Sequence, residues 1–95
     1  MMNDTFTIES AAHLAARVGE MVGSDAPAAK RIEAVYPLVF SRKPSAAEIQ
    51  WGEAHLKEQV RIYMAANEPV PQASAKAFLS LAQMLLSSNE FLYVD

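Results

Sequence analysis

Apolar residues recur at three- and four-residue intervals near the start of the chain, which is the period of an amphipathic helix. The pattern predicts a first helix from Thr5 or Phe6 to about Met21, with a cap from a polar side chain among residues 3–5. Gly23 comes next, where helices commonly end. The apolar positions of this helix are Ile8, Ala11, Ala12, Leu14, Ala15, Val18, Met21 and Val22.

A second helix is expected after Asp25, which can act as its N-terminal cap. Pro27 then falls in the first turn, where its missing N–H is harmless. Pro37 lies inside the pattern and removes one helical hydrogen bond, so a kink or an early end of the helix is expected there. Because the apolar spacing continues past the proline, the helix is predicted to reach about Phe40. Its core face is Ile32, Val35, Tyr36, Val39 and Phe40.

The segment around Pro44 predicts the start of a third helix. Ser45 and Glu48 have the spacing of a capping box, in which each side chain accepts the other residue's backbone N–H. The helix is expected from about residue 46 to 66. Its apolar line is Ile49, Gly52, Leu56, Val60, Tyr63 and Met64. Gly52 on that line favours the close approach of another helix, and Trp51 beside it is expected to cover the rim.

The fourth helix is predicted to begin near residues 72–74, after a loop with two prolines, and to end near Ser87. Ser87, Ser88 and Asn89 are expected to break it, because short polar side chains compete for backbone hydrogen bonds. A final turn over residues 90–94 would then lay Phe91 and Leu92 back on the core. The predicted core face is Phe78, Leu81, Ala82, Leu85 and Leu86, widened by Leu79 and Met84.

These patterns predict an all-α fold and a single helical domain over residues 1–95. The chain has no alternating β-branched run and no Asn-Gly or Asp-Gly hairpin sequence. With 52% hydrophobic and 20% charged residues, it is too apolar to be disordered. We expect a small bundle of about four helices, with a short C-terminal helical turn packed back on the core.

Charge and composition exclude several classes of function. The net charge is −3, and the lysines and arginines form no basic run, which disfavours binding to nucleic acid or to an anionic membrane surface. No apolar stretch approaches the ~20 residues needed to span a bilayer, so no membrane insertion is expected. The absence of cysteine excludes disulfides, thiolate catalysis and covalent haem attachment. The first residues do not resemble a signal peptide, and they leave the localisation of the chain undetermined.

Candidate catalytic chemistry is sparse. Glu9 and His13 stand one helical turn apart and could offer two metal ligands, but the further pairs of a helical metal centre are missing. A solvent-facing Glu–His pair is the simpler interpretation. His55, three residues before Glu58, is interpreted as a histidine at the core boundary. The sequence therefore indicates no catalytic, cofactor-binding or metal-binding residue and favours a domain that is not an enzyme.

Several residues stand in an order known from one bacterial family. Arg42, Pro44, Ser45 and Glu48 form an Arg-x-Pro-Ser-x-x-Glu element, and the chain closes with Asn89-Glu90-Phe91-Leu92-Tyr93-Val94-Asp95. Met2-Asn3-Asp4, Leu14-Ala15-Ala16-Arg17-Val18, Arg31-Ile32 and Leu81-Ala82-Gln83 extend the match. Over essentially its whole length the chain resembles the C-terminal domain of unknown function of planctomycete-type cytochrome-c-domain-containing surface proteins. It departs from the family at Ser41, commonly Gly there, and at Phe78, usually Trp.

The resemblance implies that the chain is the C-terminal part of a larger exported protein, periplasmic or at the cell surface. Many members carry an N-terminal haem-binding segment, so any haem chemistry would lie elsewhere and this domain would hold no cofactor. The family has no established activity, so no catalytic residue is carried over. The matching residues imply a structural motif, made of Arg42, Pro44, Ser45, Glu48, Asn89, Glu90 and Phe91.

Three hypotheses of function remain. The first is a non-catalytic helical domain that packs on a neighbouring domain of the parent protein or on a partner protein. The second is a free-standing helical adaptor that forms a homodimer through the third helix or the tail. The third is an enzyme with a carboxylate site or a site built on Glu9 and His13.

Overall fold

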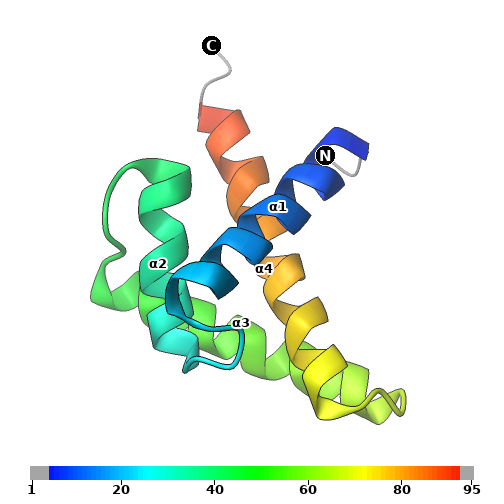
Figure 1. Ribbon diagram of the computed structural model, residues 1–95. Coiled ribbons are helices and arrows are strands. Elements are labelled where there is room, and N and C mark those ends of the chain that lie inside the picture. The colour runs from blue at the N-terminus through cyan, green and yellow to red at the C-terminus, as the bar shows by residue number, and fades with distance from the viewer. Residues whose placement is uncertain (1–4, 93–95) are drawn as a thin grey trace.

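Four helices account for nearly all of the part of the chain that the computed structural model describes, which is residues 5–92, with side chains for residues 8–88. They are α1 (Thr5–Val22), α2 (Ala28–Phe40), α3 (Ala46–Ala65) and α4 (Val70–Leu92). No strand occurs within residues 5–92. Short connections join the helices into a bundle in which α4 packs against all of the others (Figure 1). The predicted all-α bundle of four helices is confirmed.

The core gathers around the apolar face of α4. Phe78, Leu81 and Leu85 are buried there, and Ala73, Ala77 and Ala82 let neighbouring helices approach closely. The other helices cover this face with Val18 of α1, Leu56 of α3, and Ile32, Val35, Tyr36 and Val39 of α2. The predicted core faces of α2 and α4 are therefore largely correct. In α1, Ala11 and Val18 are buried, whereas Ile8, another of the predicted apolar positions, is 43% exposed.

The crossing of α2 and α3 depends on Gly52. A Cβ atom added at Gly52 would lie 2.8 Å from Cδ1 and 3.3 Å from Cγ1 of Ile32, and Ile32 is fully buried. Only glycine leaves room for this side chain, so the close approach predicted for Gly52 is present and its partner is Ile32.

The ends of α2 differ in part from the prediction. The helix passes through Pro37 and continues to Phe40, as expected. Its N-terminal cap, however, is Pro27, and no side chain forms a capping hydrogen bond. The expectation that Asp25 caps the helix is wrong, because the turn over residues 24–26 leaves this exposed side chain two residues before the cap.

The fourth helix is longer than the sequence suggested. It begins at Val70, with Pro71 in its first turn, and runs without a break to Leu92. The predicted break at residues 87–89 and the separate final turn are therefore wrong. Serine and asparagine lower helix propensity by less than ~1 kcal/mol each, and a helix anchored by buried residues tolerates that cost. The expected packing of Phe91 and Leu92 on the core lies outside the described side chains.

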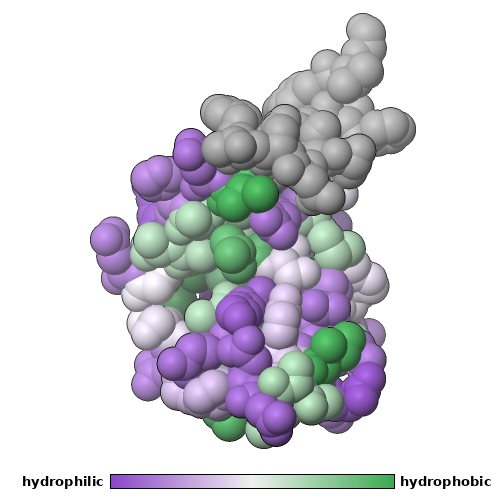
Figure 2. Space-filling view, turned by 90° about the vertical axis from the view of Figure 1, so that its right-hand side faces the viewer, coloured by the Kyte–Doolittle hydropathy of each residue, from purple (hydrophilic) through white to green (hydrophobic). Residues whose placement is uncertain are grey.

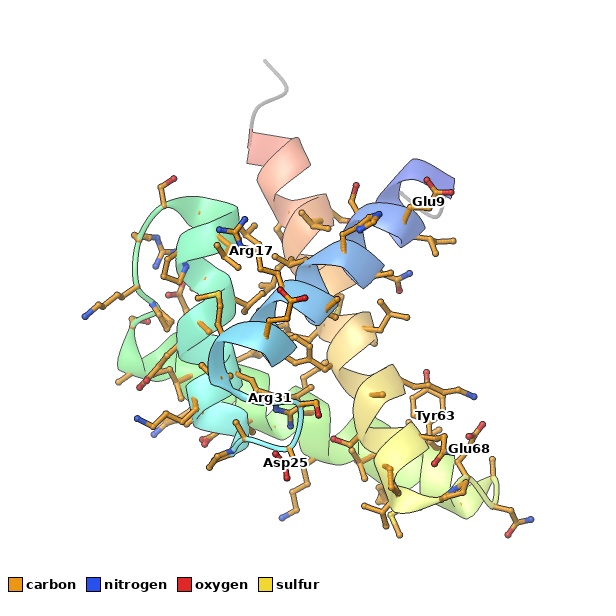
Figure 3. The ribbon with its side chains drawn as sticks, viewed as in Figure 1. Glu9, Arg17, Asp25, Arg31, Tyr63 and Glu68 are labelled. Carbon is orange, nitrogen blue, oxygen red and sulfur yellow. The ribbon has the colours of Figure 1, made fainter. Side chains whose placement is uncertain are left out.

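The connection between α3 and α4 is held by local contacts. Asn67 has a φ of 70°, which turns the chain after α3. Glu68 then pairs with Lys76 of α4, whose Nζ also lies 5.7 Å from the ring centroid of Tyr63. Figure 3 shows Tyr63 and Glu68 at this end of the molecule. These contacts set α3 and α4 side by side.

We expect Gly52→Ala to destabilise the protein by about 1 kcal/mol, because overpacking against Ile32 outweighs the gain in helix propensity. In a chain that also carries Ile32→Val, which removes Cδ1, the same change should become neutral or stabilising. Chemical denaturation of the four proteins in a double-mutant cycle measures the coupling.

Gly19 provides the control, because an added Cβ there would be 3.8 Å from its nearest neighbour, Cβ of Ser24. Gly19→Ala should stabilise α1 by up to ~1 kcal/mol. Equal effects of the two glycine substitutions would show that the close approach at Gly52 is not a packing constraint.

Candidate interaction surface

The loop between α2 and α3 begins with a backbone turn at Ser41. This residue ends α2 in the left-handed region, with φ 61° and ψ 29°, and its N–H donates to the carbonyl of Pro37 at 3.0 Å. The turn carries Arg42 back over the last turn of α2. The guanidinium carbon lies 5.7 Å from the ring centroid of Tyr36 and 5.5 Å from that of Phe40. The cation therefore covers two aromatic rings.

The start of α3 carries the predicted capping box. Ser45 Oγ accepts the backbone N–H of Glu48 at 3.1 Å, and Glu48 Oε1 accepts the backbone N–H of Ser45 at 2.8 Å. Arg42 completes the arrangement, because its Nη1 and Nη2 donate to the two carboxylate oxygens of Glu48 at 2.8 and 2.7 Å. Pro44 lies half-buried within the loop. The structure thus brings together the four predicted motif residues of this segment.

Glu48 is the charged centre of this network. The Arg42 hydrogen bonds, together with the smaller effect of the backbone N–H of Ser45, lower the pKa of Glu48 from its ordinary value of 4.5 to about 2. The carboxylate is therefore ionised throughout the physiological range, and the two arms of Arg42 stay occupied. The loop therefore presents a paired cation and anion rather than free charges.

A groove of about 780 Å³ opens beside this loop, where α2, the start of α3 and the C-terminal half of α4 meet. We call it the Trp51 groove. Trp51 is 46% exposed and Met84 is 40% exposed on its walls. Its lining is completed by Tyr36, Phe40, Arg42, Ala47, Glu48, Leu85, Ser87 and Ser88. The groove therefore presents aromatic rings and a thioether, with its charged groups already paired.

Trp51 is held in place by His55. The two rings stack with centroids 5.5 Å apart and planes 15° apart. Nε2 of His55 in turn lies 3.3 Å from Oγ of Ser80, which links α3 to α4. Burial lowers the pKa of His55, so the neutral imidazole is favoured at neutral pH. The structure places His55 at the core boundary, as the sequence suggested, although its partner is Ser80 and not Glu58.

Other large apolar side chains are exposed away from the groove. They are Ile8, Met21, Ile62, Met64 and Val70, spread over three of the helices. On the face shown in Figure 2, hydrophobic residues gather in small groups with hydrophilic residues between them. Among the described residues, the Trp51 groove is the place where a cavity coincides with an exposed tryptophan.

The remaining candidate residues add no catalytic site to this picture. Glu9 and His13 both lie exposed on α1 (Figure 3 labels Glu9). Within the part of the chain that the structure describes, no group of three or more histidine, aspartate or glutamate side chains could hold a metal ion. The side chains of Asn89, Glu90 and Phe91 lie outside the described residues, although their backbone belongs to α4.

Sequence reasoning does not find the groove itself. Helical periodicity assigns Tyr36 and Phe40 to the core and treats Met84 as a widening of a core face. Tyr36 is indeed buried, whereas Phe40 is only partly buried and Met84 is 40% exposed. Nothing in the periodicity of one helix shows which neighbours leave a gap. Trp51, which lies off its apolar line, is the one available sign.

Comparisons with known proteins add no relative: no protein-family profile, curated protein or solved structure matches the chain. No helix within the described residues is both long enough and apolar enough to cross a membrane. The Trp51 groove and the residues that carry the family resemblance are therefore the features of this chain that bear on its function.

Glu48→Gln should destabilise the protein by about 1 kcal/mol at pH 7, through loss of the ion pair and weakening of the cap. Because the pKa of Glu48 is lower in the folded chain than its ordinary value of 4.5, its contribution is complete above that value. The contribution is lost as the pH falls toward 2. Urea denaturation of both proteins between pH 7 and 2 should show the difference in unfolding free energy shrinking over this window.

Glu53→Gln is the matched control, because Glu53 is exposed on the same helix and makes no ion pair among the described residues. It should change stability little at any pH in the series. A pH-independent difference for Glu48→Gln, or equal behaviour of the two variants, would contradict the assigned network.

Ser41→Gly should stabilise the protein by about 1 kcal/mol, because a left-handed backbone costs an L-residue that much and costs glycine almost nothing. Thermal unfolding followed by circular dichroism measures the change. An unchanged or lower midpoint would show that the Ser41 side chain makes a compensating contribution.

Proposed function

We propose that this chain is a non-catalytic helical interaction domain, which packs through the Trp51 groove against a neighbouring part of a larger exported bacterial protein. The single observation that carries the proposal is the groove, where the exposed Trp51 and Met84 lie over apolar walls contributed by three helices.

The composition of the groove is that of a protein interface. Tryptophan, tyrosine, phenylalanine, methionine and arginine are the residues enriched at such surfaces. Trp51 is also fixed in orientation by its stacking on His55, so little side-chain freedom is lost when a partner binds. A preorganised aromatic wall of this kind suits binding to a partner more than it suits chemistry.

The charges of the groove indicate the chemistry of the partner. Arg42 and Glu48 satisfy each other at the rim, so neither offers a free charge. The walls are otherwise apolar, apart from the hydroxyl groups of Tyr36, Ser87 and Ser88. The partner segment is therefore expected to insert a neutral apolar side chain, aliphatic or aromatic, rather than a charged one.

The family resemblance supports a parent protein as the source of that segment. The chain resembles the C-terminal domain of planctomycete-type cytochrome-c-domain-containing surface proteins, whose members are long and exported. The proposed partner is the region that precedes the domain in such a protein. The domain would then have a structural role, and haem chemistry would belong to another part of the parent.

The only tryptophan of the chain reports directly on the groove. The test begins with the reading frame upstream of Met1, where an in-frame continuation with an export sequence and a Cys-x-x-Cys-His segment is expected. In the joined protein, Trp51 fluorescence should shift to the blue and become protected from acrylamide quenching, relative to the isolated chain. When the two parts are mixed as separate chains, Met84→Glu should weaken association at least tenfold.

Met21→Glu is the matched control, since Met21 is also an exposed helical methionine but lies outside the groove. It should leave association unchanged. Equal effects of the two substitutions would contradict docking at the groove, and equal quenching of Trp51 in the joined and isolated chains would do the same.

A homodimeric adaptor is the second candidate. Trp51 and Ile62 are both exposed on α3, about three helical turns apart on one face of the helix. Such a stripe could pair with its copy. Light scattering decides between the candidates: a mass that rises to twice the monomer value at micromolar concentration, and falls with Ile62→Glu, would favour the homodimer.

A further inference from the structure

A second cleft lies at the opposite end of α4 from the Trp51 groove. It has a volume of about 590 Å³ and is bounded by the C-terminal half of α1, the start of α2 and the first turns of α4. We call it the Arg31 cleft. Its walls are mainly apolar, with Ala15, Val18, Val70 and Phe78 among them. The cleft shares no residue with the Trp51 groove, so a ligand bound there is independent of the proposed function.

Arg31 brings a positive charge into this cleft. Its side chain is half-buried, and its Nε donates to the carbonyl of Ala26 at 3.1 Å. The guanidinium carbon lies over the ring of Phe78, 5.2 Å from its centroid. The side chain is therefore anchored at Nε and placed against an aromatic ring, and the hydrogen bond leaves the two terminal nitrogens, Nη1 and Nη2, unused.

No carboxylate compensates this charge in the part of the chain that the structure describes. Arg42, Arg61 and Lys76 form ion pairs with glutamates there, but Arg31 forms none. Asp25 also lines the cleft, and Figure 3 shows it near Arg31, yet the two are not within ion-pair distance. Burial lowers the pKa of Arg31 from its ordinary value, with no opposing effect from an acidic neighbour.

Partial burial of a guanidinium without a counter-ion carries a desolvation cost, and buried cations in proteins are usually paired. The two terminal nitrogens form a fork whose spacing matches the two oxygens of a carboxylate. Phosphate or sulfate is a poorer match for this cleft, because its walls are mainly apolar and only the hydroxyl groups of Ser24 and Ser74 remain as side-chain donors for the other oxygens of a strongly hydrated ion. Asp25 at the cleft would also repel a doubly charged anion.

We propose that the Arg31 cleft binds a small organic acid, with its carboxylate on the Arg31 guanidinium and an aromatic or short aliphatic body against the walls beside Phe78. The volume of the cleft lies within the usual range for small-molecule sites, roughly 300–1,000 Å³. Ser24 and Ser74, which also line the cleft, can donate to the carboxylate or to a polar substituent of the acid.

Benzoate is the probe for this site, and benzamide is its neutral counterpart of similar shape. In a titration of the full chain followed by amide chemical shifts, benzoate should produce saturable shifts at residues of the cleft. Benzamide should bind at least tenfold more weakly, and inorganic phosphate should not saturate the same residues. Arg31→Gln should weaken benzoate binding at least tenfold, whereas Lys30→Gln, with the same change of charge at an exposed neighbour, should leave it unchanged.

A second pair of variants keeps the test informative if Arg31→Gln folds poorly. Ala16→Leu places a larger side chain at the cleft without touching the charge, and it should abolish benzoate binding. Ala12→Leu makes the same change at an exposed position of α1 outside the cleft and should have no effect. The proposal is overturned if benzoate does not bind saturably, if benzamide or phosphate binds equally well, or if Ala16→Leu binds benzoate as the unsubstituted chain does.

Discussion

Burial of the apolar face of α4 is the constraint on which the rest of the structure depends. Phe78, Leu81 and Leu85 can leave water only if the other helices close over them, and apolar burial of this kind is the main stabilising term in a small domain. Ala73 and Ala77, also buried on this helix, keep the neighbouring helices close. Because α1, α2 and α3 all pack against α4, they do not pack against one another along their whole lengths, and gaps remain between them.

Both cavities result from that arrangement. The Arg31 cleft forms where α1 and α2 diverge beside the first turns of α4, and the Trp51 groove forms where α2 and α3 meet beside its C-terminal half. Each lies toward an end of the central helix, where fewer neighbours surround it. A small four-helix domain thus carries two cavities without an insertion or a long loop.

The two cavities differ in whether the arginine that lines each of them has an acidic partner. At the Trp51 groove, the cation Arg42 pairs with Glu48 and contacts two aromatic rings. The groove is therefore mainly apolar, and the charged groups at its rim are already paired. In the Arg31 cleft, the cation donates one hydrogen bond through Nε, lies over Phe78 and has no described acidic partner. The first environment suits an apolar protein segment, and the second suits a small anion. Electrostatic pairing therefore distinguishes the sites more clearly than their size does.

The sequence by itself determined the features that depend on near neighbours in the chain. Helical spacing located α1, α2 and α3, the capping box at Ser45 marked the start of α3, and Gly52 indicated a close helix crossing. These predictions succeed because caps and periodicity act within one or two helical turns. The prediction that Asp25 caps α2 is also local, but it is wrong. The turn before Pro27 places Asp25 two residues before the cap, where its side chain forms no capping hydrogen bond with the helix.

Only the tertiary structure decided the extent of α4 and the two cavities. The weak helix propensities of Ser87 and Ser88 are overcome because the helix on which they stand is anchored by buried neighbours such as Leu85. The partner of Gly52, the pairing of Arg42 and the exposure of Trp51 all depend on which helix lies beside which. The same is true of Arg31, which forms no ion pair within the described part of the chain. No pattern along a single helix encodes that, because a cavity is the space that several packed helices fail to fill.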